Sequence, residues 1–246
     1  MAVFPADESY SALWAELAGA RRTLRFAAAH HAQAQVYARQ AIWCGSFWQV
    51  SAATPAGELE YDLHVAGAHN VKNSLASVAC ALAAGVPLAA IASGLTAFEP
   101  VRGRSRALQV SPAGQPVTLV DDSYNANPDS VRAAIDVLAA LPGPRLLVLG
   151  DMGEVGNQGP QFHAEALRYA QQKNIDKVLV TGSAFANAAI DFNGIEVHPM
   201  MAELQAGVLR WLPGVASVLV KGSRFMKMEQ VVQALVTASD NRSMAC

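Results

Sequence analysis

The amino-acid sequence predicts an α/β fold in which the second half of the chain forms a parallel sheet with helices on both faces. After Pro100, apolar runs of strand length alternate with stretches of helical periodicity, which is the pattern of strand–helix–strand units. These runs are apolar throughout, as expected of strands that are buried on both faces. With 246 residues, 52% of them hydrophobic, the chain suffices for one large domain or two ordinary ones.

Before residue 100 the segments are shorter and more varied. Residues 2–6 are predicted to form a strand and residues 8–20 a helix, in which Trp14 and Leu17 have helical spacing. Four short alternating segments follow, separated by turn residues, and they are typical of antiparallel strands. Two helices complete this half. The four strands are expected at 23–27, 35–43, 47–52 and 58–65, and the two helices at 70–84 and 88–98.

The second half begins after a short hinge, Pro-Val-Arg-Gly-Arg at 100–104. Its strands and helices are predicted to alternate along the chain. The strands are expected at 117–120, 145–149, 177–180 and 217–220, and the helices at 129–141, 161–173, 202–211 and 226–238.

The composition excludes several classes of protein. A chain with 15% charged residues and 52% hydrophobic residues is not intrinsically disordered. With 18 glycines, 12 prolines and 3 cysteines it is neither collagen-like nor a disulfide scaffold. Its net charge of −2 provides no general attraction to nucleic acid or anionic lipid, so neither is an expected partner.

No disulfide framework, metal site, secretion signal or membrane span is predicted. The cysteines Cys44, Cys80 and Cys246 are far apart, which is typical of a reducing compartment. The N-terminus lacks a basic stretch followed by an apolar run. Residues 73–98 carry no charge, but they are rich in alanine and are interrupted by Pro87, which favours two buried helices over a span.

Polar, glycine-containing turns follow four of the predicted strands. Ligands bind outside the carboxyl ends of parallel strands, and right-handed crossovers bring those ends to one edge of the sheet. We therefore expect the four turns to form a ligand site together. They are Asp-Asp-Ser-Tyr-Asn-Ala-Asn at 121–127, Gly-Asp-Met-Gly-Glu at 150–154, Thr-Gly-Ser at 181–183 and Lys-Gly-Ser-Arg at 221–224.

These turns have structural alternatives to a binding role. The carboxylates of Asp121 and Asp122 suit ribose hydroxyls or a cation, but they also suit a turn in which Asn127 caps the next helix. Residues 221–224 place two cations and a hydroxyl at a helix start, which suits an anion or a plain helix cap. The glycines at 150–156 have the wrong spacing for a dinucleotide fingerprint, so a NAD site is rejected.

Three further side chains lie outside these turns. Asn70 and Asn73 are three residues apart in a predicted helix, so their amides share a face that suits the edge of adenine, although asparagine near a helix start is also a common cap. Arg104 is placed to reach a phosphate held between the two halves, or to form a surface ion pair. The histidines are interpreted as structural and the large aromatic residues as core: His30, His31, His163 and His198, and Tyr10, Trp14, Trp43, Phe47 and Trp48.

Five segments, in this order, resemble the Mur ligase family. The first two are general to the family, and the other three resemble the member that adds D-alanyl-D-alanine to UDP-N-acetylmuramoyl-tripeptide. The resemblance covers essentially the whole chain. The segments are Gly-Ala-His-Asn-Val-Lys-Asn at 67–73, Pro-Val-Arg-Gly-Arg at 100–104, Asp-Asp-Ser-Tyr-Asn-Ala-Asn-Pro at 121–128, Leu-Gly-Asp-Met-Gly-Glu at 149–154 and Val-Lys-Gly-Ser-Arg-Phe-Met-Lys-Met-Glu at 220–229.

The resemblance implies a domain organisation. Members of the family have a UDP-sugar domain, a central ATPase domain and a C-terminal Rossmann-like domain that receives the incoming amino component. By resemblance, residues 1–101 are the last part of the central domain and residues 102–246 are the C-terminal domain. The family's phosphate loop, its Mg²⁺-binding glutamate and its carbamylated lysine would lie upstream. We therefore expect a C-terminal fragment that is inactive alone, from a protein that is monomeric and cytoplasmic when complete.

The resemblance also implies ATP and Mg²⁺ as cofactors and peptidoglycan precursor synthesis as the function. ATP would phosphorylate the terminal carboxylate of UDP-N-acetylmuramoyl-tripeptide, and the amine of D-alanyl-D-alanine would attack the acyl phosphate. Arg104 would be catalytic, reaching the phosphates on domain closure. The expected nucleotide-binding residues are Asn70, Asn73, Arg104, Asp122, Tyr124, Asn125 and Asn127, and Lys221, Ser223 and Arg224 would face the dipeptide carboxylate.

Two other functions agree with parts of the sequence. The isolated chain, without a phosphate loop, would also suit a non-catalytic module that binds the dipeptide or a protein. A sibling ligase of the diaminopimelate-adding or folylpolyglutamate type shares the first two motifs.

Overall fold

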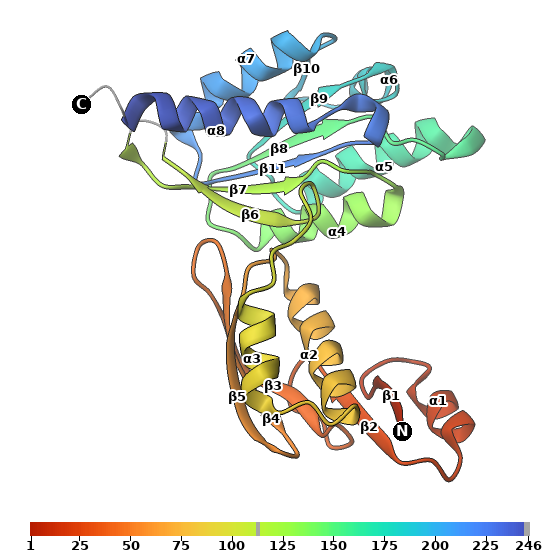
Figure 1. Ribbon diagram of the computed structural model, residues 1–246. Helices are drawn as coiled ribbons and strands as arrows, with labels where there is room; N and C mark the ends of the chain where they lie inside the picture. Colours follow the sequence, from red (N-terminus) through yellow and green to blue (C-terminus); the bar gives the residue numbers. More distant parts are fainter. Residues whose placement is uncertain (112–113, 244–246) are drawn as a thin grey trace. The chain divides into compact units, whose positions relative to one another are not determined.

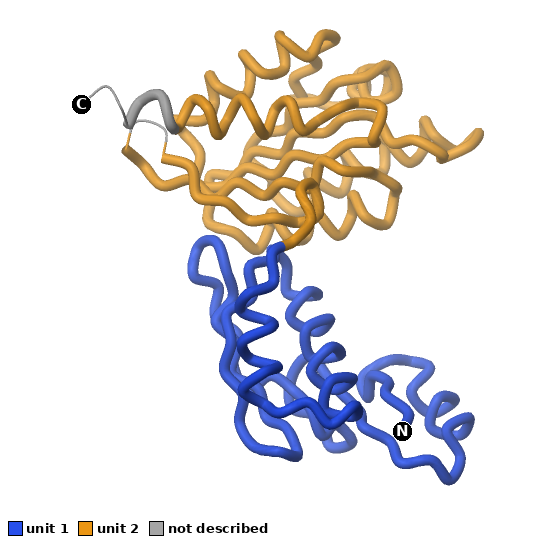
Figure 2. Tube along the Cα trace, in the orientation of Figure 1, with its two compact units in different colours: residues 1–99 blue, residues 100–246 orange. Residues whose placement is uncertain are grey.

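The computed structural model describes residues 1–111 and 114–243. The chain divides into two compact units, Met1–Glu99 and Pro100–Cys246, which we call unit 1 and unit 2 (Figure 2). Each unit has its own sheet and its own buried core. The α/β fold class with parallel strands that the sequence predicts is confirmed.

The sheet of unit 1 has the strand order β1-β2-β3-β4-β5 (Figure 1). Helices α2 and α3 supply Leu75, Val78 and Ile91 to a core that includes Val36 and Val50 of the strands. This burial of aliphatic side chains is the main source of stability for the unit. The elements are β1 (Ala2–Pro5), α1 (Ser11–Ala18), β2 (Thr23–Ala27), β3 (Val36–Trp43), β4 (Trp48–Thr54), β5 (Gly57–Leu63), α2 (Ala68–Ala83) and α3 (Leu88–Thr96).

The prediction that all four middle strands of unit 1 are antiparallel is wrong for β2. This strand is parallel to β1 on one side and to β3 on the other, while β3–β4 and β4–β5 are antiparallel. The antiparallel pairs are joined by tight turns. The segment 28–35 instead places Val36, the first residue of β3, beside Phe26 near the end of β2, and β3 continues in the same direction from there.

Helix α1 is shorter than predicted, and it buries little. Of its eight residues only Ser11 and Ala18 are buried. Tyr10, interpreted as a core residue, is 62% exposed, which makes that interpretation wrong. The helical spacing of Trp14 and Leu17 predicted an apolar stripe, but Leu17 is 68% exposed, so this side of the helix faces solvent in part.

Tyr61 gives unit 1 a predicted sensitivity to alkaline pH. Its side chain is buried, its hydroxyl lies 2.6 Å from Ser74 Oγ, and burial raises its pKa to about 12. The unfolded chain loses this proton at the ordinary value of 10.0, so unfolding is favoured as the pH rises through that interval. We expect the free energy of unfolding to fall by about 2 kcal/mol between about pH 9 and pH 12.

Urea unfolding at a series of pH values, followed by tryptophan fluorescence, measures this effect. The Tyr61→Phe variant serves as the control, because it keeps the buried ring and removes the ionisable hydroxyl. The pH dependence should be shallower in the variant, and an unchanged slope would assign the effect to other groups.

The sheet of unit 2 has the strand order β10-β9-β8-β11-β7-β6. All adjacent pairs are parallel except β6–β7, so the predicted parallel sheet is confirmed with one antiparallel edge strand. The elements are β6 (Arg106–Val110), β7 (Val117–Asp122), α4 (Pro128–Ala139), β8 (Arg145–Gly150), η2 (Gly156–Gln158), α5 (Gly159–Gln172), β9 (Lys177–Thr181), α6 (Ser183–Ala189), β10 (Ile195–Val197), α7 (Met201–Trp211), η3 (Leu212–Gly214), β11 (Ser217–Lys221), η4 (Arg224–Met226) and α8 (Glu229–Ser243).

Helices cover both faces of this sheet. In Figure 1, α7 and α8 lie on one face and α4 and α5 on the other. Leu204 of α7 and Val231 of α8 pack against Leu146 and Val218 of the strands, all of them fully buried. The runs of apolar residues in β7, β8, β9 and β11 are buried along their length, which explains why they do not alternate.

Three elements of unit 2 are absent from the sequence prediction: β6, α6 and β10. The strand β6 begins with an arginine at the edge of the sheet, and β10 has only three residues. Helix α6 has seven residues and no side-chain cap, so no start signal marks it. The structure also contains no helix, among the residues it describes, with the length and hydropathy of a membrane span.

Candidate functional site at the carboxyl edge of the unit 2 sheet

The polar turns of unit 2 lie at one edge of the sheet, as the sequence predicts. In the parallel register, Lys221 is paired with Asp122 on one side and with Leu149 on the other, and Gly150 is paired with Thr181. The ends of β7, β11, β8 and β9 are therefore adjacent. This arrangement brings four loops that are distant in the sequence to one place.

The two aspartates that end β7 bind the hinge segment 100–104 and the residue that follows it. Asp121 is 5% exposed, and its Oδ2 accepts a hydrogen bond of 3.0 Å from the N–H of Gly103. Its Oδ1 accepts from the N–H and the hydroxyl of Ser123, at 3.2 and 2.6 Å. Asp122 Oδ1 accepts from the N–H and the hydroxyl of Ser105, at 2.9 and 3.3 Å. The two carboxylates thus tie the hinge segment to the loop that follows β7.

Lys221 is buried beneath this loop and is only 3% exposed. Its Nζ lies 2.6 Å from Asp122 Oδ2 and donates to the carbonyl oxygen of Asn125 at 2.9 Å. A buried ion pair persists only where hydrogen bonds offset the cost of desolvation, and both groups here have additional partners. Lys221 therefore supports the 121–127 loop from inside the unit.

Ser223 is buried as well and connects two of the loops. Its Oγ accepts a hydrogen bond from the N–H of Gly153, and its own N–H donates to the carbonyl of Asp151 at 3.0 Å. The carboxylate of Asp151 accepts from the N–H groups of Ala184 and Phe185, at 3.0 and 2.9 Å. The loops after β11, β8 and β9 are therefore joined in one network.

His163 also belongs to this network, and its role is structural, as the sequence analysis predicts. It is fully buried, with Nδ1 2.6 Å from the carbonyl of Gly159 and Nε2 accepting from the N–H of Met152 at 2.9 Å. This pattern is that of a neutral imidazole that donates from Nδ1. Its ring also meets the edge of Phe185, with centroids 4.5 Å apart.

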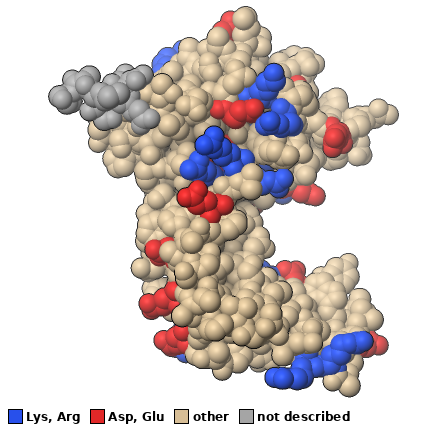
Figure 3. Space-filling view, in the orientation of Figure 1, with Lys and Arg blue, Asp and Glu red and all other residues tan. Residues whose placement is uncertain are grey.

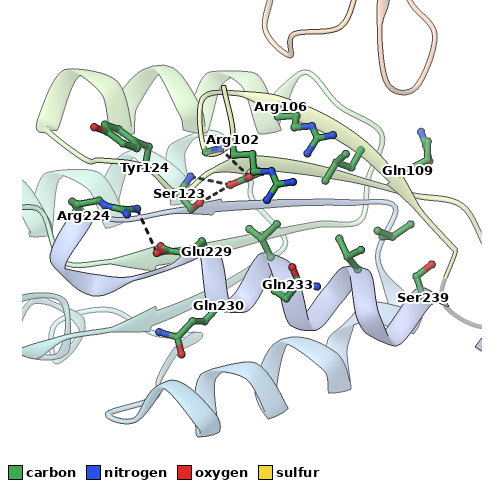
Figure 4. A pocket seen from close by; sticks show the side chains of 16 residues that line it. Arg102, Arg106, Gln109, Ser123, Tyr124, Arg224, Glu229, Gln230, Gln233 and Ser239 are labelled. Carbon is green, nitrogen blue, oxygen red and sulfur yellow. Dashed lines mark hydrogen bonds and ion pairs between the residues drawn. The ribbon is translucent and has the colours of Figure 1, made fainter. Parts of the chain in front are cut away.

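Two arginines meet one exposed aromatic ring at the surface of this edge. The guanidinium carbon of Arg104 lies 4.6 Å from the ring centroid of Tyr124, and that of Arg224 lies 5.5 Å from it. Tyr124 is 41% exposed and Arg224 also forms an ion pair of 3.4 Å with Glu229 (Figure 4). Among the described residues Arg104 has no acidic partner, so its guanidinium is held by stacking.

Asn125 and Asn127 line the same loop, and part of their hydrogen-bonding capacity is used locally. Asn125 Oδ1 accepts from the N–H of Ala126 at 2.9 Å. Asn127 caps α4, because its Oδ1 accepts from the N–H of Ser130 at 2.8 Å and Ser130 Oγ accepts from the N–H of Asn127 at 3.0 Å. The capping alternative for this turn is therefore confirmed, and it leaves the amide N–H₂ groups as potential ligand contacts.

In unit 1, Asn70 and Asn73 share one face of α2, as their spacing predicts. The amide nitrogen of Asn73 donates to Asn70 Oδ1 at 3.1 Å, and that of Asn70 donates to the carbonyl of Ala66 at 2.7 Å. Each amide keeps one unused N–H, and Asn73 Oδ1 has no partner among the described residues. A donor and an acceptor side by side match the edge of an adenine.

Lys72, between these asparagines, holds the N-terminal turn of the chain. Its Nζ lies 2.8 Å from Asp7 Oδ1 and also binds Glu8. Burial alone would lower the pKa of Lys72, but the hydrogen bonds to Asp7 and Glu8 raise it overall. The motif at 67–73 therefore combines a structural cation with two amides that face outward.

The sequence analysis missed the residues that hold Arg104 in place. Gly103 has φ +79°, and a Cβ there would lie 2.8 Å from the backbone nitrogen of Tyr124. Ser105 also has a positive φ, 49°. The sequence did contain a signal for this conformation, because a glycine such as Gly103 often marks a left-handed or closely packed backbone. No cluster of ligands for a metal ion is found in the described part of the chain.

Known proteins resemble this chain in sequence. Residues 103–224 match the family model described as Mur ligase, glutamate ligase domain. The chain is 34% identical over 240 residues to UDP-N-acetylmuramoyl-tripeptide–D-alanyl-D-alanine ligase of Escherichia coli (strain K12), covering 96% of this chain and 52% of that protein. This chain thus spans about half the length of that relative.

Solved structures show the same fold. MurF from Acinetobacter baumannii has a TM-score of 0.77 and 31% identity, covering 96% of this chain and 51% of that one. The MurF ligase from Thermotoga maritima in complex with ADP has a TM-score of 0.75 at 21% identity, covering 98% and 54%. The molecule is thus an α/β protein whose polar loops gather at the carboxyl edge of a parallel sheet. The chain belongs to the Mur ligase family.

Proposed function

We propose that this chain is part of an ATP-dependent ligase that adds D-alanyl-D-alanine to UDP-N-acetylmuramoyl-tripeptide in peptidoglycan precursor synthesis. The observation that carries the proposal is the similarity to the Escherichia coli ligase of that name over 96% of this chain. The geometry supports it, because polar loops and exposed arginines gather at the sheet edge where α/β proteins bind ligands. The complete protein would act in the cytoplasm as a monomer.

The proposed domain division is 1–101 and 102–246, and each part has its own residues that are expected to contact the nucleotide. Asn70 and Asn73 fit an adenine edge, because a donor and an acceptor remain free on one helix face. Arg104 would neutralise the charge of the phosphates. Asp122, Tyr124, Asn125 and Asn127 would line the ribose side, with Asp122 oriented by Ser105 and Lys221. ATP, when bound, supplies the phosphoryl group that activates the peptide carboxylate.

The described residues do not form a site for Mg²⁺, so its ligands in the complete ligase would come from elsewhere in the protein. The residues of this chain would instead orient the incoming amine toward the acyl phosphate and exclude water from it. Of the three residues expected to face the dipeptide, Arg224 is exposed, while Lys221 and Ser223 are buried and bonded internally. Arg224 is therefore the one of the three that is placed to face the dipeptide, and Lys221 and Ser223 support the loops around it.

A chimeric ligase tests this proposal. The segment of the Escherichia coli ligase that matches this chain is replaced by the 246-residue chain, and ATP-dependent ligation is measured with a panel of amine substrates. Preference for D-alanyl-D-alanine over diaminopimelate and glutamate is the expected result. A folded chimera, verified by circular dichroism, that fails to ligate would contradict the proposal, and preference for another amine would indicate a sibling ligase.

In the active chimera, Arg104→Ala is expected to lower kcat/KM for ATP about tenfold to a hundredfold, the range expected when a charged hydrogen bond of roughly 1.5–3 kcal/mol is lost. Tyr124→Ala should reproduce part of this loss, because it removes the ring on which Arg104 stacks. Tyr124→Phe keeps the ring and is the matched control. If Arg104→Ala leaves kcat/KM unchanged, Arg104 has no role at the phosphates.

A further inference from the structure

A pocket of about 700 Å³ lies in unit 2 between the edge strand β6 and helix α8, beside the loop that contains Tyr124. Figure 4 shows Arg102 and Arg106 on the strand side of this pocket and Gln233 on the helix side. None of the roles assigned above uses Arg102 or Arg106. Figure 3 shows that basic side chains gather on this face of the unit, with acidic atoms between them.

The two arginines of the pocket are not neutralised by the protein. The guanidinium groups of Arg102 and Arg106 have no hydrogen bond or ion pair with any residue of 1–111 and 114–239 whose side chain is described. The carboxylate of Asp121 also borders the pocket, but it is buried and already accepts three hydrogen bonds. Two unpaired guanidiniums in a pocket favour an anionic ligand, and their planar geometry suits a carboxylate.

Glu229, the first residue of α8, also lines the pocket, and its carboxylate favours a cationic group of the ligand. Its Oε1 is paired with Arg224 at 3.4 Å. Its Oε2 is buried and has no hydrogen-bond partner. A buried carboxylate oxygen without a donor is costly, so a ligand that brings an N–H group to it would be stabilised. The acidic side chain at this helix start also disfavours a phosphate there.

The remaining lining suits a short peptide with small side chains. Leu108, Val110, Val232 and Val236 form an apolar surface between the polar ends of the pocket. The amide side chain of Gln233 faces this space and can both donate to and accept from a peptide group.

We propose that this pocket binds a zwitterionic dipeptide, with its carboxylate on Arg102 and Arg106 and its ammonium at Glu229. The identity of the dipeptide as D-alanyl-D-alanine rests on the proposed function, whereas the pocket itself does not. The pocket lies beside the sheet edge and shares Arg224 and Tyr124 with it, so a dipeptide held here stands next to the nucleotide loop. Arg102 and Arg106 then determine specificity for a free carboxylate.

Calorimetric titration of the 246-residue chain with D-alanyl-D-alanine tests the assignment. Arg102→Gln and Arg106→Gln are each expected to raise the dissociation constant for the dipeptide about tenfold. This is the loss of affinity expected when one charge-assisted hydrogen bond is removed. Arg168→Gln, on the exposed surface of α5 and outside the pocket, is the matched control and should bind normally. The dipeptide amide and the N-acetyl dipeptide should both bind more weakly than the dipeptide.

Glu229→Gln should abolish the difference between the free dipeptide and its N-acetyl derivative. Inorganic phosphate should not compete. Unchanged binding in both arginine variants, equal binding of the amide, or effective competition by phosphate would each overturn the proposal. If the chimera ligates normally but the dipeptide does not bind the pocket, only this inference is refuted. If the dipeptide binds the pocket but the folded chimera is inactive, the proposed function is refuted and the pocket assignment stands.

Discussion

Replacing Gly182 with alanine is expected to lower the free energy of unfolding of unit 2 by about 4 kcal/mol, through backbone strain and a steric clash together. Gly182 has φ +101° and lies between β9 and α6. A Cβ at this position would lie 2.3 Å from the carboxyl carbon of Asp151. That carboxylate cannot move away without losing its hydrogen bonds to Ala184 and Phe185.

Urea unfolding followed by hydrogen exchange of the unit 2 strands measures the loss. The matched control is Gly194→Ala, because Gly194 also has a positive φ, +80°, but no atom lies within 4 Å of the added Cβ. This control should cost only about 1–2 kcal/mol, the strain of the backbone alone. Equal losses in the two variants would show that contact with Asp151 is not the cause.

The second large effect is expected at Lys221. Lys221→Ala should destabilise unit 2 by about 3 kcal/mol, because it leaves the carboxylate of Asp122 in a largely buried position without its cation. Asp122 would retain only its hydrogen bonds from Ser105. The carbonyl of Asn125 would lose its donor as well, so the 121–127 loop should become mobile.

Lys227→Ala, on the exposed surface six residues later, is the control and should change stability by less than about 0.5 kcal/mol. The double variant Lys221→Ala, Asp122→Ala should lose less than the sum of the single losses, because each single change strands a buried charge. Strict additivity in denaturant unfolding would mean that the two groups are not coupled, contrary to their separation of 2.6 Å.

Part of the candidate site follows from the sequence through one rule of sheet geometry. Each apolar run of unit 2 is followed by polar residues, and parallel strands end at a common edge. This is enough to predict that Asp122 and Lys221, nearly a hundred residues apart, lie together. The helix cap at Asn127 could also be predicted, because asparagine followed by proline commonly begins a helix.

Other features of the fold and the site depend on contacts between distant residues, which no local sequence pattern shows. The direction of β2 is decided by the path of the segment 28–35, and its own residues fit either pairing. The pairing of Lys221 with Asp122 makes it a buried support rather than an exposed contact, although the same residues in a loop suggest anion binding. The strand β6, whose arginine lines the pocket beside α8, carries too little alternation to be recognised.

The sequence by itself determined the α/β class, the strands that are buried on both faces, the shared edge of their loops and the family. These features follow from the periodicity of apolar residues and from the order of short motifs, which are properties of the chain itself. The tertiary structure alone decided which polar atoms remain available. Arg102, Arg106 and Arg104 are accessible, whereas Lys221, Ser223 and Asp121 are satisfied internally, because hydrogen-bond partners are assigned only when distant loops meet.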